Sequence, residues 1–452
     1  MGHPAFRPAV PFLLLAAAGL VLAWPVLSWP MTYDDLHLIR SYSMREVLGG
    51  FAGRWDPDDM ETAGLRPLYL VFNHLRYAVF GESVAAHRVF LVLLFAAYLA
   101  LLVDPLERLG IRRAEAVVAG VLCLWSRFSV YHYAFLTDGA HLAQGVCFAL
   151  SLRAALRAVD GAGAKTMAVS LFWLLVGLFI REDTMAAVPV LLLLAFVAAH
   201  RRGPASMRLL AVAALGSAVL CAGVMAYRAA VVVRLPQDRL SAAGFLRGLA
   251  NAMSLSGRES FDAWSHVSER SWRWLPVLPV LAAVIGCGQE RWRPLLFLAC
   301  TVLACSSALV VTRDNLLLYP VTFMAVAVAA SLGVLARSGR VGRFAAAALL
   351  VWLAVGELRL SREFQLVFHP YSATGLRWSG EFVYGAYWQA TVPAGRREEI
   401  VARLEGLGIR DEAQFKDKLP RKTYTATVNG PWRPTGDARV FSPRLAFRAF
   451  RP

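Results

Sequence analysis

Long apolar runs separated by short polar segments fill most of the chain, beginning with AVPFLLLAAAGLVLAWPVLSW at residues 9–29. A helix of about 20 apolar residues crosses a bilayer, and shorter runs can cross when flanking residues extend them. The pattern therefore predicts an all-α polytopic membrane protein with about eleven transmembrane helices. The predicted spans are roughly 9–29, 85–103, 114–132, 140–157, 166–180, 185–199, 209–232, 275–288, 295–311, 316–336 and 342–358.

The first apolar run is expected to remain as a span rather than to be removed as a secretory signal. It is longer than the apolar core of a signal peptide, and little positive charge precedes it. Its WPVLSWP exit also lacks a small-residue cleavage site. The amino terminus therefore belongs to the membrane domain.

Composition and charge support the membrane assignment and give its orientation. Hydrophobic residues make up 58% of the chain and charged residues 17%, whereas soluble proteins are closer to a quarter charged. The net charge of +16 would suggest nucleic acid in a soluble chain. Here every second loop is rich in arginine, as expected of cytoplasmic loops. We therefore predict a plasma (inner) membrane protein with a cytoplasmic amino terminus and no nucleic-acid partner. The basic loops contain Arg108, Arg112 and Arg113; Arg153, Arg157 and Lys165; Arg201, Arg202 and Arg208; Arg291 and Arg293; and Arg337, Arg340 and Arg343.

This topology divides the chain into a transmembrane domain at 1–358 and a tail at 359–452 on the outer side. The tail contains segments with helical and strand patterns, so we expect a small extracytoplasmic α+β domain. Two long outer loops are predicted at 30–84 and 233–274.

Each long outer loop contains a segment with the pattern of an amphipathic helix lying on the membrane surface. The segments are 67–80 and 243–255. In the first, Pro67 suits the opening turn and Gly81 suits the end of the helix. Its apolar positions share one helical face, as expected of an interfacial helix. They are Leu68, Val71, Phe72, Leu75 and Val79.

The adjacent carboxylates Asp34 and Asp35 directly follow the first predicted span. Two neighbouring acids at a membrane surface repel each other and are costly to desolvate. Loop solubility alone would require only some polar residue. We therefore interpret the pair as candidate catalytic residues at the mouth of a membrane cavity.

Acidic residues also occur in the three short outer loops. Asp138 precedes His141, Arg181 precedes Glu182 and Asp183, and Arg313 precedes Asp314. All these loops are expected at the same end of the bundle as the acidic pair. We take Asp138, His141, Arg181, Glu182 and Arg313 as candidate substrate-binding residues. The alternative is that the arginines simply pair with neighbouring acids.

The six cysteines lie in or beside apolar segments and form no CxxC motif. This pattern predicts neither disulfides nor a structural metal site. No His or Asp spacing resembles a dedicated metal cage, so we expect no obligatory cofactor. Because several acids converge, binding of a non-obligatory divalent metal ion stays open.

The order of motifs in residues 10–100 resembles the GT-C class of membrane glycosyltransferases, and most closely its protein O-mannosyltransferase-like branch. The residues that carry the resemblance follow the first span in order. They are Asp34-Asp35, Leu65-Arg66-Pro67-Leu68, Asn73-His74, Phe80-Gly81 and His87. Leu65 replaces the usual aromatic residue. The tail lacks the tetratricopeptide repeats found in some relatives, which leaves the acceptor open among protein, glycan and lipid.

The resemblance implies a polyprenyl-phosphate sugar donor and transfer to an acceptor hydroxyl outside the cell, with inversion. Asp34 would deprotonate the acceptor and Asp35 would support it, since adjacent carboxylates push their pKa values apart. Arginine binds phosphate oxygens in pairs, which suits Arg66, Arg181 and Arg313 to the leaving group. His37 and His141 are candidates for binding sugar hydroxyls. Pentosyltransferases share this architecture, so the sugar stays open.

Two other functions fit parts of the pattern. An undecaprenyl-diphosphate-dependent polymerase or ligase could use the arginines and histidine of loop 233–274. A lipid-linked sugar transporter would place ionisable groups near the membrane midplane, usually between repeated halves. The chain shows no internal repeat, and its charges lie at the predicted helix ends. The sequence therefore favours the glycosyltransferase, with membrane lipids as its surroundings.

Overall fold

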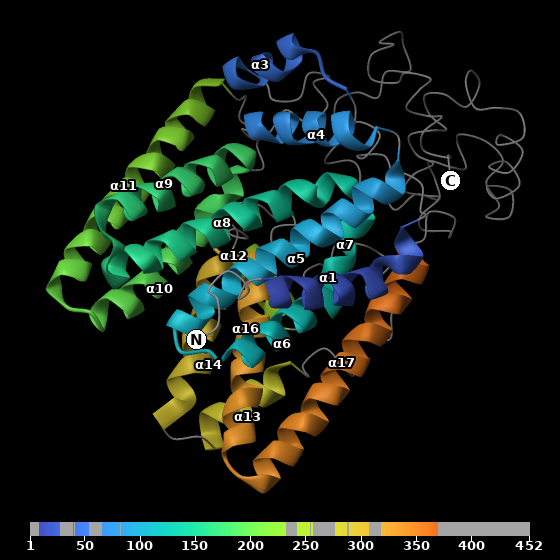
Figure 1. The fold of residues 1–452 in the computed structure, drawn as a ribbon, viewed down its shortest axis with the longest axis vertical. Coiled ribbons are helices and arrows are strands. Elements are labelled where there is room, and N and C mark those ends of the chain that lie inside the picture. The colour runs from blue at the N-terminus through green and yellow to red at the C-terminus, as the bar shows by residue number, and fades with distance from the viewer. Residues whose placement is uncertain are drawn as a thin grey trace, which may run out of the picture.

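A computed structural model describes residues 9–27, 39, 41–53, 66–81, 83–231, 242–253, 255, 276–286, 289–306 and 318–368. Within these ranges the regular secondary structure is helical throughout, as predicted (Figure 1). Most of the predicted C-terminal domain, most of loop 233–274 and part of loop 30–84, including the acidic pair, lie outside them. The α-helices are α1 (Ala9–Ala23), α3 (Met44–Ala52), α4 (Pro67–Phe80), α5 (Val84–Arg108), α6 (Arg113–Trp125), α7 (Arg127–Ala134), α8 (Gly139–Arg157), α9 (Gly163–Ile180), α10 (Val188–His200), α11 (Pro204–Val231), α12 (Ala242–Met253), α13 (Val277–Gly286), α14 (Trp292–Ala304), α16 (Leu318–Arg337) and α17 (Arg340–Phe368).

Short helical turns connect several of these helices. A 3-10 turn, η2 (Trp24–Val26), extends α1, and η3 (Leu136–Asp138) precedes α8. A π-helical turn, η4 (Ala158–Ala162), joins α8 to α9, while η5 (Glu182–Ala187) joins α9 to α10. A further 3-10 turn, η7 (Gln289–Arg291), precedes α14.

Seven helical segments in the described ranges are long and apolar enough to cross a membrane, or eight if α6 and α7 form one bent span. One of the seven, Leu136–Ile180, contains both α8 and α9. Every predicted span overlaps a helix, yet α13 and α14 have only 10 and 13 residues. At 1.5 Å per residue these are short for a core about 30 Å thick. The structure thus supports a polytopic helical membrane protein, and the count of eleven spans stays a prediction.

The centre of the bundle is α16, which is apolar on all sides. In the most apolar 18-residue stretch of α16, 89% is buried inside the protein. The corresponding stretches of α11 and α17 are only 22% buried. α16 packs against α6, α13, α14 and α17. A hydroxyl hydrogen bond from Tyr98 on α5 to Thr322 on α16, 3.2 Å long, also links the central helices. A helix that is hydrophobic all round is expected in such a position.

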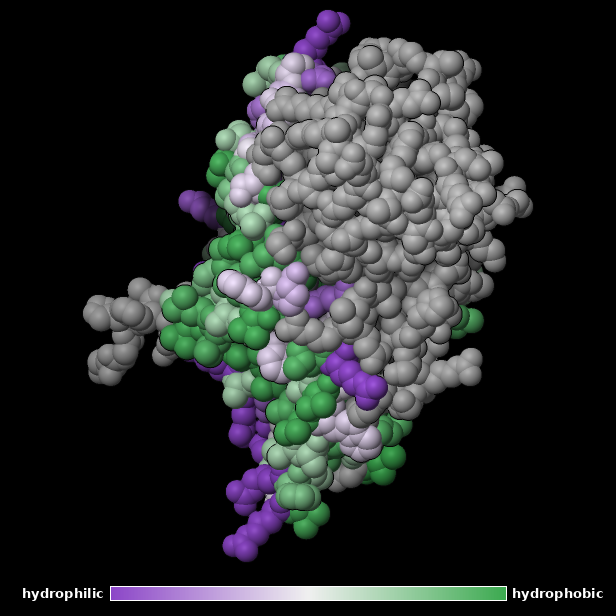
Figure 2. Space-filling model, turned by 90° about the vertical axis from the view of Figure 1, so that its right-hand side faces the viewer, coloured by the Kyte–Doolittle hydropathy of each residue, from purple (hydrophilic) through white to green (hydrophobic). Residues whose placement is uncertain are grey.

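Large apolar side chains are exposed on the outer helices. Examples are Leu215 and Val219 on α11, and Phe344 and Val351 on α17. Figure 2 shows much of the described surface on one side as hydrophobic, with hydrophilic side chains towards its ends. An apolar surface of this extent would be unfavourable in water and suits contact with lipid.

α8 and α9 are antiparallel neighbours joined by a tight connection. Ser151 on α8 donates a hydrogen bond of 2.9 Å to the Ser170 carbonyl oxygen on α9. The chain reverses at Gly161 and Gly163, whose φ values are 117° and 79°. Only glycine adopts such angles readily. Consequently Gly139 and Ile180, at the far ends of the two helices, lie at the same end of the bundle.

The predicted span 114–132 is bent in the structure. α6 and α7 meet at an angle of 69°. Ser126, between them, has the extended angles φ −63° and ψ 147°, and its hydroxyl donates a hydrogen bond of 2.7 Å to the Cys123 carbonyl oxygen. A serine side chain can replace a helical backbone partner in this way. After the bend, α7 packs against α5 and α17.

The predicted amphipathic helices are present as α4 and α12. α4 begins with Pro67 at its first position and ends at Gly81, whose φ is 53°. Leu75 and Val79 are exposed, as expected for the apolar face. α3, next to α4, begins with a capping box between Ser43 and Glu46. At the other end of the chain, α17 continues to Phe368, past the predicted domain boundary at 358.

Candidate functional site

Two of the predicted short outer loops meet at one end of the bundle. The first runs from α7 through η3 into α8 and carries Asp138 and His141. The second is the η5 turn between α9 and α10, and carries Arg181, Glu182 and Asp183. Because α8 and α9 are antiparallel, the start of α8 lies beside the end of α9. The third loop, with Arg313 and Asp314, lies outside the described residues.

Five side chains from these loops form what we call the histidine–carboxylate cluster: His132, Asp138, His141, Arg181 and Asp183. Asp138 lies between the two histidines, with carboxylate oxygens 3.9 Å from His132 Nδ1 and 3.9 Å from His141 Nε2. His141 Nδ1 is 3.9 Å from Asp183 Oδ2. Arg181 Nε ends the row, 3.3 Å from Asp183 Oδ1.

The cluster is buried, and its histidines lie 3.9 Å from its carboxylates. The side chains of His132 and His141 are 1% exposed, and that of Asp138 is 12% exposed. A separation of 3.9 Å exceeds the normal length of a hydrogen bond but allows strong electrostatic interaction away from bulk water. Asp138 precedes α8, yet its side chain makes no capping hydrogen bond. Its carboxylate is therefore not committed to holding the helix.

Arg66 and Glu182 form a second charged group at this end. Arg66 Nε lies 3.6 Å from Glu182 Oε2, and the two side chains are 16% and 18% exposed. The alternative that each arginine pairs with a neighbouring acid holds for Arg181, which pairs with Asp183 rather than with Glu182. Glu182 instead contacts Arg66 from the first long outer loop. This ion pair connects Arg66, in the motif Leu65-Arg66-Pro67-Leu68, to the η5 turn.

The polar face of α4 points inward over these loops. The Tyr69 hydroxyl donates to the Thr137 carbonyl oxygen at 3.1 Å, and Arg76 Nη1 donates to the Leu136 carbonyl oxygen at 2.8 Å. Between them on the helix, Asn73 is completely buried, and neither of its amide atoms has a hydrogen-bond partner in the described part of the chain. A buried amide without hydrogen bonds is energetically unfavourable unless a ligand supplies the missing hydrogen-bond partners.

Arg76 also fixes His87, a residue of the resemblance motif. Its Nε donates to His87 Nδ1 at 3.3 Å, while His87 Nε2 lies 3.0 Å from the Gly81 carbonyl oxygen. His87 therefore donates through Nε2 and accepts through Nδ1. Gly139 allows this arrangement, because a Cβ there would collide with Arg76 Nη1.

Arg88 anchors the chain that leads to the acidic pair. Its guanidinium is completely buried and donates to the carbonyl oxygens of Ala134 and Leu27, both at distances of 3.3–3.4 Å. Downstream, Ile39 is completely buried in the main core. The described chain on both sides of the acidic pair is therefore held at this end of the bundle.

The predicted site residues fall into three groups. Asp138, His141 and Arg181 are brought together in one cluster, with Arg66 and Glu182 paired at the same end. Asp34, Asp35, His37 and Arg313 lie outside the described residues. The structure adds His132, Arg76 and Arg88 as functional candidates that the sequence did not point to. It also adds Asn73 and Asp183, which in the sequence were only a motif residue and a loop acid. Arg88 could have been found from the sequence, because it is an ionisable residue within the predicted span 85–103.

No group of three or more His, Cys, Asp and Glu side chains in the described residues has a geometry that could hold a metal ion. Five cysteines within those ranges are free thiols, namely Cys123, Cys147, Cys221, Cys300 and Cys305. Cys287 lies outside them.

Comparisons with protein-family models, with curated proteins and with solved structures gave no match to this chain.

Proposed function

We propose that the protein is a GT-C-like membrane glycosyltransferase. It moves a sugar from a polyprenyl-phosphate donor to an acceptor hydroxyl, with inversion, at the end of the bundle that carries the histidine–carboxylate cluster. We assign this end to the outer face of the plasma membrane, because the basic loops mark the opposite end.

The observation that carries the proposal is the histidine–carboxylate cluster itself. Ionisable side chains in an apolar bundle are costly to bury and are functional candidates by default. Here two histidines and two carboxylates lie 3.9 Å apart in a row, with side chains no more than 12% exposed. A sugar hydroxyl can donate to these carboxylates and accept from these imidazoles.

The buried Asn73 supports the same conclusion. Its amide offers one acceptor and two donors without a partner in the described residues. A sugar hydroxyl both donates and accepts, so it can satisfy such a group. Asn73 lies on the inward face of α4, next to the chain segment that precedes Asp138.

In this proposal the residues divide the reaction between them. Asp34 removes the proton from the acceptor hydroxyl as the bond between the sugar and the phosphate oxygen breaks, and Asp35 supports it. Arg66 and Arg181 bind the phosphate leaving group, each guanidinium being held by a carboxylate. The role proposed for Arg313 is the same. Asp138 and His141 bind the sugar.

The test is transfer from a panel of radiolabelled polyprenyl-phosphate sugars in membranes containing the wild type, D34N or D35N. The same loop contains a second adjacent pair, Asp58-Asp59, so D58N/D59N is a matched control. We expect D34N to lose transfer while D58N/D59N retains it, at equal expression. Equal transfer by all variants would exclude the catalytic assignment. Transfer from a diphosphate donor alone would favour the polymerase or ligase.

A further inference from the structure

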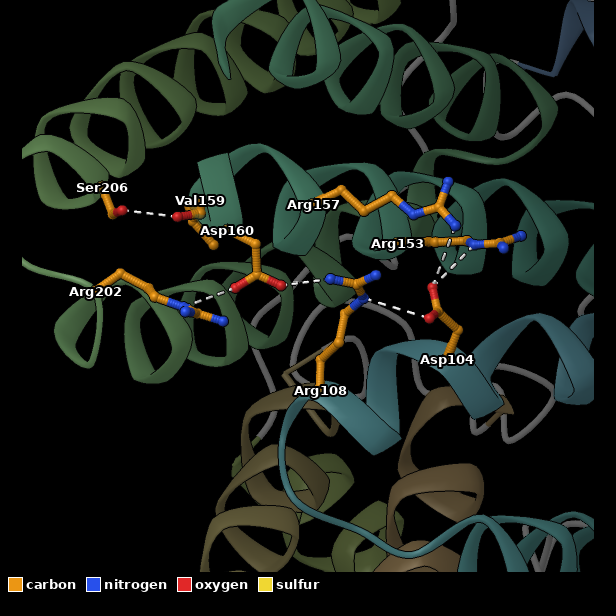
Figure 3. Close-up of polar contacts among 8 residues, drawn as sticks. All are labelled: Asp104, Arg108, Arg153, Arg157, Val159, Asp160, Arg202 and Ser206. Atoms are coloured by element: carbon orange, nitrogen blue, oxygen red, sulfur yellow. Dashed lines mark hydrogen bonds and ion pairs between the residues drawn. The ribbon is translucent and has the colours of Figure 1, made fainter. Parts of the chain in front are cut away.

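The end of the bundle opposite the histidine–carboxylate cluster contains a second charged group, which we call the basic cluster. It consists of Asp104, Arg108, Arg153, Arg157, Asp160 and Arg202. Figure 3 shows the two carboxylates lying between the guanidinium groups. His141 and Arg157 lie near opposite ends of α8, about 24 Å apart at 1.5 Å per residue. The two clusters therefore lie near opposite faces of the membrane.

Asp104 on α5 gathers three arginines. Its carboxylate oxygens lie 3.1 Å from Arg153 Nε, 3.6 Å from Arg157 Nη2 and 3.4 Å from Arg108 Nε. Arg153 and Arg157 are one turn apart on α8 and so reach the same partner. This carboxylate therefore draws the three guanidinium groups together.

Asp160 extends the group to the connections between helices. It contacts Arg108 Nη1 through Oδ2, and its Oδ1 lies 3.1 Å from Arg202 Nε, in the turn between α10 and α11. Asp160 sits on the π-helical turn η4, which Ser206 also holds by donating to the Val159 carbonyl oxygen at 2.7 Å. π-Helical turns are rare and occur often at functional sites.

The basic cluster has more positive charge than its own carboxylates neutralise. Four arginines against two aspartates leave a net charge of +2. Each guanidinium has five N–H donors, so many donors are left over after the contacts with aspartate. Arg157 and Arg202 are the most open, with side chains 45% and 59% exposed. The cluster is thus a partly exposed set of guanidinium donors with an excess of positive charge.

The surface beside the basic cluster is apolar. Phe196 on α10 and Val212 on α11 are 44% and 58% exposed, within about three turns of Arg202. Basic groups at the end of transmembrane helices bind anionic headgroups when the adjoining surface accepts acyl chains. Charge and apolar surface occur here together.

We propose that the basic cluster binds the phosphate headgroup of an anionic phospholipid, with the acyl chains along α10 and α11. Arginine recognises phosphate through paired N–H donors, and the net charge of +2 matches a lipid with two phosphates. The site is independent of the proposed glycosyltransferase activity, because it uses none of the same residues.

The test measures binding of cardiolipin, a lipid with two phosphates, to the purified full-length protein in detergent by native mass spectrometry. The variant R157Q/R202Q removes the two most open arginines and leaves Arg108 and Arg153 on their aspartates. Each cationic side chain near an anionic lipid contributes about a fivefold effect, so we expect binding to weaken about thirtyfold. Phosphatidylcholine should bind weakly to all variants.

The matched control is R340Q/R343Q, which removes the same charge from two exposed arginines of α17. We expect it to bind cardiolipin as the wild type does. Equal weakening in both double variants would show a general charge effect and overturn the proposal. Displacement of the lipid by excess inorganic phosphate would also overturn it, because the site would then be one for a free anion. The single variant R202Q, with about a fivefold loss, repeats the test if R157Q/R202Q folds poorly.

Discussion

The two charged clusters at opposite ends of α8 are built in different ways. In the basic cluster, contacts of 3.1–3.6 Å join side chains that are 19–59% exposed. In the histidine–carboxylate cluster, the contacts that involve histidine are 3.9 Å long and the side chains are 1–12% exposed. The basic cluster is partly exposed, whereas the histidine–carboxylate cluster is buried and has longer distances between its histidines and carboxylates.

Under the functions proposed above, the buried cluster acts on the substrate and the exposed cluster binds lipid. Exposed ion pairs each contribute little to the free energy of unfolding, but they require little desolvation and several can form a network. Buried charged groups are costly unless close contacts compensate them. Ionisable groups buried in an apolar bundle are functional candidates by default. Substitutions at one end should therefore change activity, and those at the other should change stability or lipid binding.

The largest effect is expected for Asp138→Asn. The change removes the charge between His132 and His141 but keeps the size of the side chain, and Asp138 makes no capping hydrogen bond. We expect sugar transfer to fall by about 100-fold or more, as for other buried electrostatic groups in active sites. Transfer and thermal unfolding of the purified protein test this. Normal transfer by a folded D138N protein would remove the cluster from the proposed site.

Gly139→Ala and Gly333→Ala compare overpacking at the two ends. A Cβ at Gly139 collides with Arg76 Nη1, and one at Gly333 collides with Glu115 Oε1 beside Arg337. Each change should reduce the free energy of unfolding by about 1–3 kcal/mol. Only G139A should also reduce transfer, because it displaces Arg76 from the Leu136 carbonyl oxygen. Equal transfer by the two variants would show that the position of α4 is irrelevant to activity.

Asn73→Leu separates stability from function at a single residue. Leucine removes an amide that is buried without a partner in the described residues, so we expect a gain of about 1 kcal/mol in the free energy of unfolding. Transfer should fall about tenfold, because one hydrogen-bonding group for the sugar is lost. Unfolding and transfer assays on the same preparation measure both. A variant that is both more stable and fully active would make Asn73 a packing residue.

Asp160→Asn is the counterpart of the Asp138 substitution at the basic end. It weakens the contacts with Arg108 and Arg202, whose side chains are 30% and 59% exposed. We expect the free energy of unfolding to fall by about 1 kcal/mol at low salt. This loss should be smaller at high salt, which screens exposed ion pairs, and transfer should be unchanged. Unfolding at low and high salt is the measurement. A large loss of transfer would contradict the division between the two ends.

The smallest effect concerns Glu290, in the basic loop beside Arg337. Hydrogen bonds from Arg337, 2.5 and 3.0 Å long, lower the pKa of the Glu290 carboxyl. A lowered pKa in the folded state stabilises the protein above the pKa of the unfolded state, and this contribution is lost as pH falls through the folded pKa. The side chain is 42% exposed, so the effect stays below about 1 kcal/mol.

The stability difference between the wild type and E290Q should accordingly shrink between pH 7 and pH 4. Thermal unfolding of both proteins across that range tests the expectation. A difference that grows on acidification would contradict the sign of the pKa shift.

The apolar pattern predicted the helices well, because each helix in a bilayer must satisfy its own backbone hydrogen bonds and expose apolar side chains. Pro67 and Gly81 likewise predicted the limits of α4, since both restrict or permit particular backbone angles locally. The regular spacing of arginines predicted one basic end. These features depend on neighbours in the sequence or on the solvent.

The partners of the candidate residues depended on tertiary structure. The short loops suggested that Asp138, His141 and Glu182 lie at one end, but the sequence did not indicate that His132 would approach Asp138. That contact follows from the bend at Ser126, where a hydroxyl takes the place of a backbone donor. Similarly, the antiparallel packing of α8 and α9 decides that Asp183 faces His141 and that Glu182 is left for Arg66.

The sequence by itself thus determined which segments are helical, which of their faces are apolar and at which end the basic residues gather. The tertiary structure decided which charged groups meet and how closely. Those distances depend on helix packing and on the backbone angles at Ser126, in η4 and in η5. The tertiary structure also decided that the polar face of α4, with Asn73 and Arg76, points inward. An amphipathic pattern shows that two faces differ, but only the packed bundle shows which one covers the site.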